Sequence, residues 1–469
     1  MIRPSTSPLA VVIAWALLWF AGCGDVVARP IGEIAGAADA TSGSDAPAFS
    51  DGSPPNDATA ICQGSGPIPL PSDGGQRCTG DLARLFRFAL CACQTLDASG
   101  TLSTDSFDSS NDAGPGDVDI SASIGANGEV STNATTTGSG SPPAVVVGGS
   151  VYAGGQNLHR RAAVTLGGSG TVLGDVQAAG DVEVSGSYQV AQNVDTTGNV
   201  VLEPGASLSV LGQVTLPSGD SAAGVSAVGG VHDATVSVAP PCDCANPIDV
   251  ASIVAAHEQD NDDAAIGLST GALVQPSAPV ELPCGQYYAT GIQGGAVTIQ
   301  IAGRVALFVD GDISVDDGLV IALAQGAQLD LFVSGNVNLM GTTTFGAPNA
   351  PARVRMYVGG SSLQLAASAR IGVNAYAPNA IVALASAFEM WGALFAQAFQ
   401  FSGDFQIHYD TSVLMADGCA PSGGSCATCD DCAGSTPACK GGQCVPCVTT
   451  ADCCAPLQCS AGSCVLTAQ

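Results

Sequence analysis

Val176–Leu202, which reads VQAAGDVEVSGSYQVAQNVDTTGNVVL, decides the fold. Apolar residues recur every 18 positions through and around it, in four series: Val164, Val182 and Val200; Leu166, Val184 and Leu202; Val172, Val190 and Leu208; Leu158, Val176 and Val194. Apolar pairs at i and i+2 lie on one face of a short strand, and the Gly-Asp and Gly-Asn dipeptides between them favour turns. The alternative fold, a flat antiparallel sheet of hairpins, would not require apolar residues to recur every 18 positions. We therefore expect an all-β, right-handed β-helix (β-solenoid) of three-sided coils stacked about 4.8 Å apart.

A second repeat follows after a break. Residues 306–315 match residues 330–339 at a spacing of 24, and residues 355–360 continue the series at 25. Segments 374–378 and 393–396 follow at about 19. We expect wider coils of a continuing or second β-helix that ends near Asp410. One aromatic residue recurs in each unit and predicts an internal stack rather than a binding stripe: Phe308, Phe332, Tyr357, Tyr376 and Phe395.

The first residues have the pattern of an export signal. Arg3 precedes an apolar run of 12 residues, Leu9–Phe20, which is too short to span a membrane. The run ends in Phe20-Ala21-Gly22-Cys23, which resembles a bacterial lipobox, although Phe20 stands where Leu is more usual. We expect a lipoprotein signal peptide over 1–22 and lipidation of Cys23; an ordinary signal with an incidental cysteine is the alternative. Each buried acyl CH₂ would contribute about 0.8 kcal/mol to membrane binding.

The charge of the chain excludes some partners. The 469 residues carry a formal net charge of −29, with 11 Arg and Lys440 as the single Lys. Such a chain repels nucleic acid and anionic lipid headgroups. Residues 23–60 are rich in Ala, Ser, Gly, Asp and Pro without apolar patterning, which predicts a disordered tether.

The cysteine count fits an oxidising compartment. There are 19 Cys, so lipidation of Cys23 leaves an even number for disulfides. Their pairing stays open. The candidates are Cys62, Cys78, Cys91, Cys93, Cys242, Cys244, Cys284, Cys419, Cys426, Cys429, Cys432, Cys439, Cys444, Cys447, Cys453, Cys454, Cys459 and Cys464.

Ten of these cysteines crowd into residues 426–464, where a C-x-x-G-x-C pattern occurs twice. So short a segment cannot build an apolar core, so we expect a disulfide-rich C-terminal module. It resembles the Dickkopf-like cysteine-rich modules of secreted proteins. A zinc site at Cys426, Cys429 and Cys432 is the weaker alternative, since no His lies nearby. We predict no metal and no cofactor.

The chain therefore divides into six parts: signal peptide 1–22, tether 23–60, first solenoid region 61–240, helix-containing connector 241–295, second solenoid region 296–415, and cysteine-rich module 419–469. Asn246 as N-cap and Pro247 after it predict a short helix over Val250–His257. This helix would cap or brace the solenoid.

Several segments carry a resemblance to known families. The 18-residue repeats resemble bactofilin-like, polymer-forming β-helices. Asp105–Ser110, Gly125–Gly128, Val373–Pro378 and His408–Asp410 look like an uncharacterised bacterial β-solenoid domain that is also attached to minor-pilin-type proteins. The resemblance covers roughly 85–415 and implies no catalytic residues. The chain departs from the pilin-linked members because a signal and tether stand in place of a pilin helix.

Motifs that could carry chemistry have simpler explanations. Gly267–Gly271 fits G-x-S-x-G but lacks the strand before it and the helix after it that a nucleophile elbow needs. The carboxylates of Asp310, Asp312, Asp316 and Asp317 lie at predicted turns, although β-helix polysaccharide enzymes place acids on coil surfaces. The acidic loop Asp260–Asp263 lacks the EF-hand spacing for calcium. We expect no enzyme.

The sequence thus predicts a lipid-anchored protein of the bacterial cell envelope, at the outer membrane or cell surface, whose solenoid is a rigid platform. Expected partners are the membrane, through the lipid, and a second copy, a surface protein or a polysaccharide at the exposed edges of the solenoid. The alternative is a carbohydrate-binding or carbohydrate-degrading β-helix protein. A groove lined by aromatics and paired acids would favour that alternative.

Overall fold

The computed structural model describes residues 82–415 except 112–120, 135–143, 157–161 and 366–368. It also describes short pieces on either side: 61–62, 66–67, 70–72 and 75–77, then 438–440, 443–445, 447, 449, 458–460 and 463–465. All of them belong to one compact unit, Ser53–Gln469. Cys23, the predicted signal peptide and the predicted tether lie outside the described residues.

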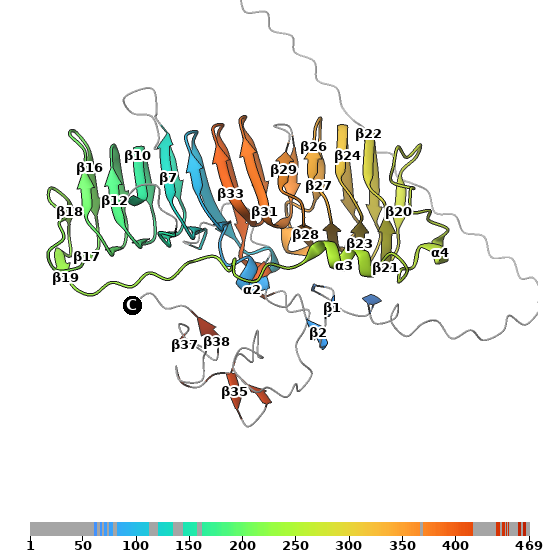
Figure 1. Ribbon diagram of the computed structural model, residues 1–469, viewed down its shortest axis with the longest axis horizontal. Helices are drawn as coiled ribbons and strands as arrows, with labels where there is room; N and C mark the ends of the chain where they lie inside the picture. Colours follow the sequence, from blue (N-terminus) through green and yellow to red (C-terminus); the bar gives the residue numbers. More distant parts are fainter. Residues whose placement is uncertain are drawn as a thin grey trace, which may run out of the picture. The chain divides into compact units, whose positions relative to one another are not determined.

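The described chain forms a parallel β-solenoid, which confirms the predicted fold class. One ladder joins 32 strands, and every pairing within it is parallel (Figure 1). We call its three parts the first coil, the first arm and the second arm. The first coil consists of β3 (Leu90–Ala92), β4 (Leu96–Ala98) and β5 (Leu102–Phe107).

The first arm consists of β6 (Ile124–Ala126), β7 (Val130–Ala134), β8 (Val145–Val147), β9 (Val151–Ala153), β10 (Ala162–Val172), β11 (Val176–Ala178), β12 (Asp181–Val184), β13 (Ser187–Val190), β14 (Val194–Thr196), β15 (Val200–Leu202), β16 (Ser207–Val210), β17 (Val214–Leu216), β18 (Ser226–Ala227) and β19 (Val231–Asp233).

The second arm consists of β20 (Val280–Leu282), β21 (Gly285–Ala289), β22 (Ile292–Ile301), β23 (Arg304–Val309), β24 (Ile313–Leu323), β25 (Gln328–Val333), β26 (Val337–Leu339), β27 (Thr344–Gly346), β28 (Val354–Val358), β29 (Ser362–Leu365), β30 (Arg370–Gly372), β31 (Asn374–Leu384), β32 (Phe388–Trp391), β33 (Leu394–Phe401) and β34 (Phe405–Asp410). It begins at Val280, within the segment that the sequence assigned to the connector.

The remaining elements are short. The helices are α2 (Leu82–Leu85), α3 (Val250–Ala256) and α4 (Asp263–Ile266), with 3-10 turns η1 (Ser109–Asn111), η2 (Pro351–Arg353) and η3 (Thr411–Met415). Three antiparallel pairs lie outside the ladder: β1 (Leu70–Ser72) with β2 (Gly75–Arg77), β35 (Ala438–Lys440) with β36 (Gln443–Val445), and β37 (Gln458–Ser460) with β38 (Ser463–Val465).

The first coil lies between the two arms. On one side β3, β4 and β5 pair with β6, β7 and β8 of the first arm. On the other side they pair with β33 and β34, the last strands of the second arm. The chain therefore starts in the middle of the solenoid, winds outward to β19, crosses to the far end, and winds back until its last coil meets its first.

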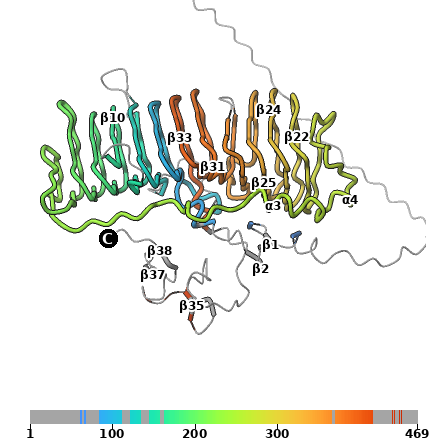
Figure 2. The backbone as a smooth tube through the Cα atoms, in the orientation of Figure 1, coloured from blue at the N-terminus to red at the C-terminus, as the bar shows by residue number. Residues whose placement is uncertain are grey.

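Residues 234–249 make that crossing, and we call them the strap. The strap leaves β19, passes along one side of the coils and leads into α3 (Figure 2). α3 begins as predicted at Val250, but its N-cap is Asp249 rather than Asn246, because the Asp249 carboxylate accepts the Ser252 N–H at 3.1 Å. The helix packs on β25.

The predicted register holds in most of the first arm. Val164, Val182 and Val200 stack in one column, and Val176 stacks on Val194. Leu208 stacks on Tyr188 rather than on Val190, because the turn after β15 is two residues longer and Val210 takes the place beside Val190. Leu158 lies outside the described residues, and Val151 fills the position below Val176.

The aromatic residues of the second repeat stack as predicted, but on the outward face of the sheet. Ring centroids are 5.1 Å apart for Phe308 and Phe332 and 4.7 Å apart for Phe332 and Tyr357. Along β23, Phe308 alternates with Leu307, and His257 after α3 stacks on the Phe308 ring at 3.8 Å. The aliphatic side chains therefore fill the interior, while the aromatic stack is buried between the sheet and the segment that covers it.

Candidate functional site

The surface of the described solenoid is poor in the features of a catalytic or sugar-binding groove. Every described Phe, Tyr and Trp side chain is buried except that of Tyr152, which is half-buried. A shallow hollow of about 230 Å³ is lined by Glu281, Gln300 and small apolar residues. A second, of about 270 Å³, is lined by Pro217, Ser218 and residues 233–236. Neither hollow joins acidic with aromatic side chains.

The G-x-S-x-G segment is part of a turn rather than an elbow. Gly267 ends the four-residue helix α4 with a φ of 68°. The Thr270 carbonyl then accepts the Thr290 N–H at 2.8 Å. This segment closes an end of the solenoid, and no strand precedes Ser269 as a nucleophile elbow requires.

Two of the four clustered carboxylates hold turns together. Asp310 accepts the Tyr288 hydroxyl at 3.0 Å, and Asp312 accepts the Asn336 N–H at 2.7 Å. Asp316 and Asp317 are exposed. None of the four carboxylates lines either of the two hollows described above.

The acidic loop Asp260–Asp263 also serves the backbone. Asp262 accepts the Gln286 N–H at 2.9 Å and Asp263 accepts the Tyr288 N–H at 3.1 Å. Burial raises the pKa of Asp263. Within the described residues, no three Cys, His, Asp or Glu side chains gather in a way that could hold a metal ion.

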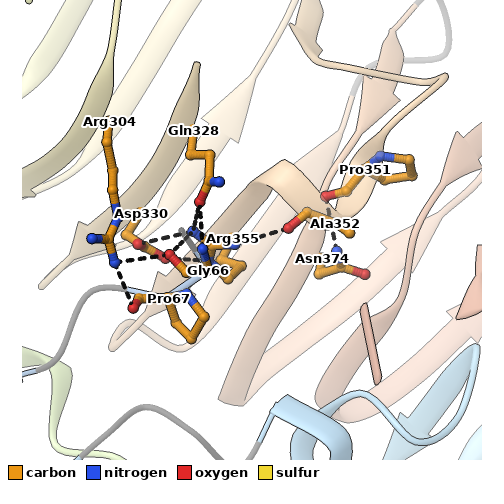
Figure 3. A network of polar contacts seen from close by, with 9 residues as sticks. All are labelled: Gly66, Pro67, Arg304, Gln328, Asp330, Pro351, Ala352, Arg355 and Asn374. Carbon is orange, nitrogen blue, oxygen red and sulfur yellow. Dashed lines mark hydrogen bonds and ion pairs between the residues drawn. The ribbon is translucent and has the colours of Figure 1, made fainter. Parts of the chain in front are cut away.

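The most concentrated polar network clamps the segment before the solenoid onto the second arm (Figure 3). Arg304 donates to the carbonyls of Ile61, Gly66 and Pro67 at 2.8–3.0 Å. Arg355 is 1% exposed, pairs with Asp330 and reaches the Gly66 carbonyl at 3.2 Å.

Within this clamp, the Asp330 carboxylate compensates the charge of Arg355. Burial by itself would lower the pKa of Arg355, but the Asp330 carboxylate outweighs it and raises that pKa. Cys62 is bonded to Cys284 beside the clamp. Residues 61–62 and 66–67 are thus held by a disulfide and by hydrogen bonds.

Two parallel disulfides fix the strap to the first coil. Cys91 is bonded to Cys242 and Cys93 to Cys244, so two C-x-C motifs face each other. The Asn127 side chain adds a paired contact, because it donates to the Cys242 carbonyl and accepts the Cys242 N–H, both at 2.8 Å.

These bonds involve six of the cysteines predicted for disulfides, and Cys447 is disulfide-bonded as well. In the tail, Cys439 lies opposite Cys444 and Cys459 opposite Cys464 across tight antiparallel pairs, as the C-x-x-G-x-C pattern allows. The other predicted sites, Cys78, Cys419, Cys426, Cys429, Cys432, Cys453 and Cys454, lie outside the described residues.

The joint between the first coil and the second arm carries a polar and aromatic cluster that the sequence did not predict. We call it the seam. His408 on β34 lies between two carboxylates: Nδ1 is 2.7 Å from Asp105 on β5, and Nε2 is 3.0 Å from Glu389 on β32. The His408 ring stacks on Trp391, and the Arg370 guanidinium lies 5.2 Å from the centroid of the Trp391 ring.

The seam stabilises the protonated form of His408. Burial would lower the pKa of the imidazole, but the hydrogen bonds and charges of Asp105 and then Glu389 outweigh it and raise the pKa. His408 and Asp105 are 303 residues apart, so no local sequence pattern could have paired them. The seam therefore joins the first coil to the last strands of the second arm, and it does not form an open site.

No helix in the described part of the chain is long and apolar enough to cross a membrane. No curated protein and no solved structure matches the chain. Residues 235–415 match a family model described as "Domain of unknown function (DUF7305)". The part of the chain that is similar to this family comprises the strap, α3, α4 and the second arm through η3.

Proposed function

We propose that the protein is a non-enzymatic, lipid-anchored component of the bacterial cell envelope, in which the solenoid is a rigid platform for a partner. The observation that carries the proposal is the surface of the described chain: no Phe, Tyr or Trp side chain is exposed there, so the described faces lack an aromatic groove. Enzymes and sugar-binding proteins gather aromatic and polar groups in a concave site.

The disulfides support the proposed rigidity of the solenoid. Three disulfides link residues that are 151 to 222 positions apart, and each joins the segment before or within the first coil to the strap or the second arm. Closing such long loops stabilises a fold by about 5 kcal/mol each in the chain-entropy model. Disulfides of this kind also suit an exported protein.

Attachment to the membrane rests on the sequence. The lipobox-like Phe20–Cys23 and the low-complexity residues 23–60 fit a lipidated Cys23 with a tether behind it. Gly24 favours the outer membrane. The likeness of the repeats to bactofilin-like and pilin-linked solenoids, and of the tail to Dickkopf-like modules, adds a structural or adhesive setting to this proposal.

The test is the chemistry of residue 23. Cells that express the full chain are fed an alkyne-tagged fatty acid, and the purified protein is analysed by click labelling and by mass spectrometry of its first peptide. We expect label and a diacylglyceryl mass on Cys23, and loss of both with loss of membrane association in Cys23→Ser. A mature protein that begins elsewhere without an acyl mass would refute the anchor.

The platform is tested separately. The purified chain is screened for binding to neutral and acidic polysaccharides and for release of reducing sugar. We expect neither; sugar cleavage, or saturable binding that is lost when exposed acids such as Asp316 and Asp317 are replaced, would favour the carbohydrate alternative.

A further inference from the structure

The two ends of the solenoid are finished differently. At the second-arm end, residues 262–275 form a cap over β21 and β22. Leu273 and Gln275 exchange backbone hydrogen bonds with Gln293 at 2.7–3.1 Å, in addition to the Thr270 and Asp262 bonds already described. Leu273 is 0% exposed, so the cap closes the apolar interior with its own side chain.

No described segment forms such a cap at the first-arm end. Val231 on β19 stacks on Val214, which is 0% exposed, but Val231 itself is 48% exposed because no described residue stacks on its other side. Val228 beside it is 78% exposed. No described residue therefore covers the interior of the first arm at this end.

The open end also carries a carboxylate that forms no ion pair with a described residue. Asp233 occupies the same column as Leu216, so its carboxylate stands at the rim of the interior, beside the hollow of about 270 Å³. From residue 162 to residue 233 the chain has seven acidic residues and no Lys or Arg. A second copy would bring the same acids to this surface and be repelled, whereas a basic segment would be attracted.

We propose that the open end of the first arm is a docking surface for an extended, basic segment of another protein. The chain's own cap defines what such a segment must supply: backbone hydrogen bonds to the free edges of β18 and β19, and an apolar side chain over Val231, as Leu273 supplies at the other end. A Lys or Arg side chain in the hollow then pairs with Asp233.

This inference names a partner class for the proposed platform and rests on that proposal for its biological setting. The test of the docking proposal is a binding measurement on purified full-length protein. The docking proposal can therefore fail while the proposed lipid anchor holds, and the lipid anchor can fail while the docking proposal holds.

The probe is an acetylated octapeptide of alternating threonine and valine with a lysine at each end, measured by fluorescence anisotropy. One control peptide has glutamates in place of the lysines, and another has a central proline that cannot donate to the ladder. We expect saturable binding of the lysine peptide and at least about tenfold weaker binding of both controls, a difference of about 1.4 kcal/mol.

Three variants locate the site. Asp233→Asn should weaken the lysine peptide by about tenfold through loss of the charge pair. Val231→Asp should abolish binding through loss of the apolar contact. Glu183→Gln removes an equal charge from the outward face of β12, away from the end, and should leave binding within about twofold of wild type.

Two sets of results would overturn the proposal. One is absent binding, or binding that Asp233→Asn and Glu183→Gln weaken equally, which is attraction to the acidic chain as a whole. The other is a wild-type protein that sediments as a dimer which Val231→Asp dissociates, because the occupant is then a second copy.

Discussion

The first arm winds narrow coils whose outward side chains are mostly exposed or half-buried, whereas the second arm includes wider coils with one outer face buried. Stacked residues are 18 apart in the column of Val164, Val182 and Val200, but 24 apart for Phe308 and Phe332. Valine columns fill the narrow interior. In the second arm, both faces of β23, β25 and β28 are buried, because α3 and the described residues 61–62 and 66–67 lie on the outward side.

This difference indicates that the stacked interior side chains are enough to stabilise a narrow coil. A wide coil is stabilised in addition by a second buried layer on its outward face. The first arm has no Lys or Arg from 162 to 233 and depends on its interior columns and turn hydrogen bonds. The second arm adds an aromatic stack and a buried ion pair beneath its cover. Substitutions in the buried layer on the outward face of the second arm should therefore lower the free energy of unfolding more than substitutions at turns.

The largest expected effect is at the buried ion pair of the second arm. Asp330→Ala leaves the guanidinium of Arg355, which is 1% exposed, without its carboxylate. We expect the free energy of unfolding to fall by about 3–5 kcal/mol, measured by guanidinium denaturation of the oxidised protein. The double variant Asp330→Leu with Arg355→Met removes both charges and should recover most of the loss. If the single variant is as stable as the double, the clamp does not depend on charge compensation.

The narrow interior of the first arm should respond to added volume. A Cβ at Gly170 would lie 2.2 Å from Cε1 of Tyr188, whose ring fills the coil and whose hydroxyl donates to the Gly167 carbonyl. We expect Gly170→Ala to destabilise the protein by about 1–3 kcal/mol, read from the same denaturation curves. Gly271→Ala is the control, since a Cβ there meets no atom within 4 Å. Equal losses in the two variants would mean that the Tyr188 ring moves aside freely.

The sequence predicted the coils because their signal is local. The columns of valine and the Gly-Asp turns repeat within 18 residues, so the strands of the first arm followed from periodicity. The seam could not be predicted in this way, since Leu90 stacks on Leu394 and each half of the contact looks like an ordinary strand. The direction of the aromatic stack was also hidden, because alternation separates two faces without saying which one a distant segment will cover.

The disulfides could be predicted from the sequence only in part. The C-x-C spacing of Cys91 and Cys93 places both side chains on one face of a strand, and the same spacing occurs at Cys242 and Cys244. That the two motifs meet depends on the path of the strap, which only the arrangement of the arms reveals. The hydrogen bond between Asn127 and Cys242 has the same origin.

Turn ladders allow the arms to be compared on equal terms. Asn199 in the first arm and Asn336 in the second each accept a backbone N–H of the next coil at 3.0 Å, and each donates its own N–H to an Asp of the coil before at 2.7 Å. Both side chains are half-buried. We expect Asn199→Ala and Asn336→Ala to cost about 1 kcal/mol each, measured by thermal and chemical unfolding. A loss at Asn199 that clearly exceeds the loss at Asn336 would show that the bare arm depends more on its turns.

The smallest expected effect is at the seam, where the second arm meets the first coil through His408. The folded-state pKa of His408 is raised above the unfolded value of about 6.5, so the contribution of the ion pairs is complete below that pH. It is lost as the pH rises through the folded-state pKa. Glu389 has 53% of its side chain exposed, so solvent screens part of this contribution. The stability of wild type relative to His408→Gln, measured by denaturation from pH 5 to pH 9, should therefore decline as the pH rises. A stability difference that is independent of pH would reduce the role of His408 to its stacking on Trp391 and its neutral hydrogen bonds. The backbone ladder and the disulfides would then be what joins the first coil to the second arm.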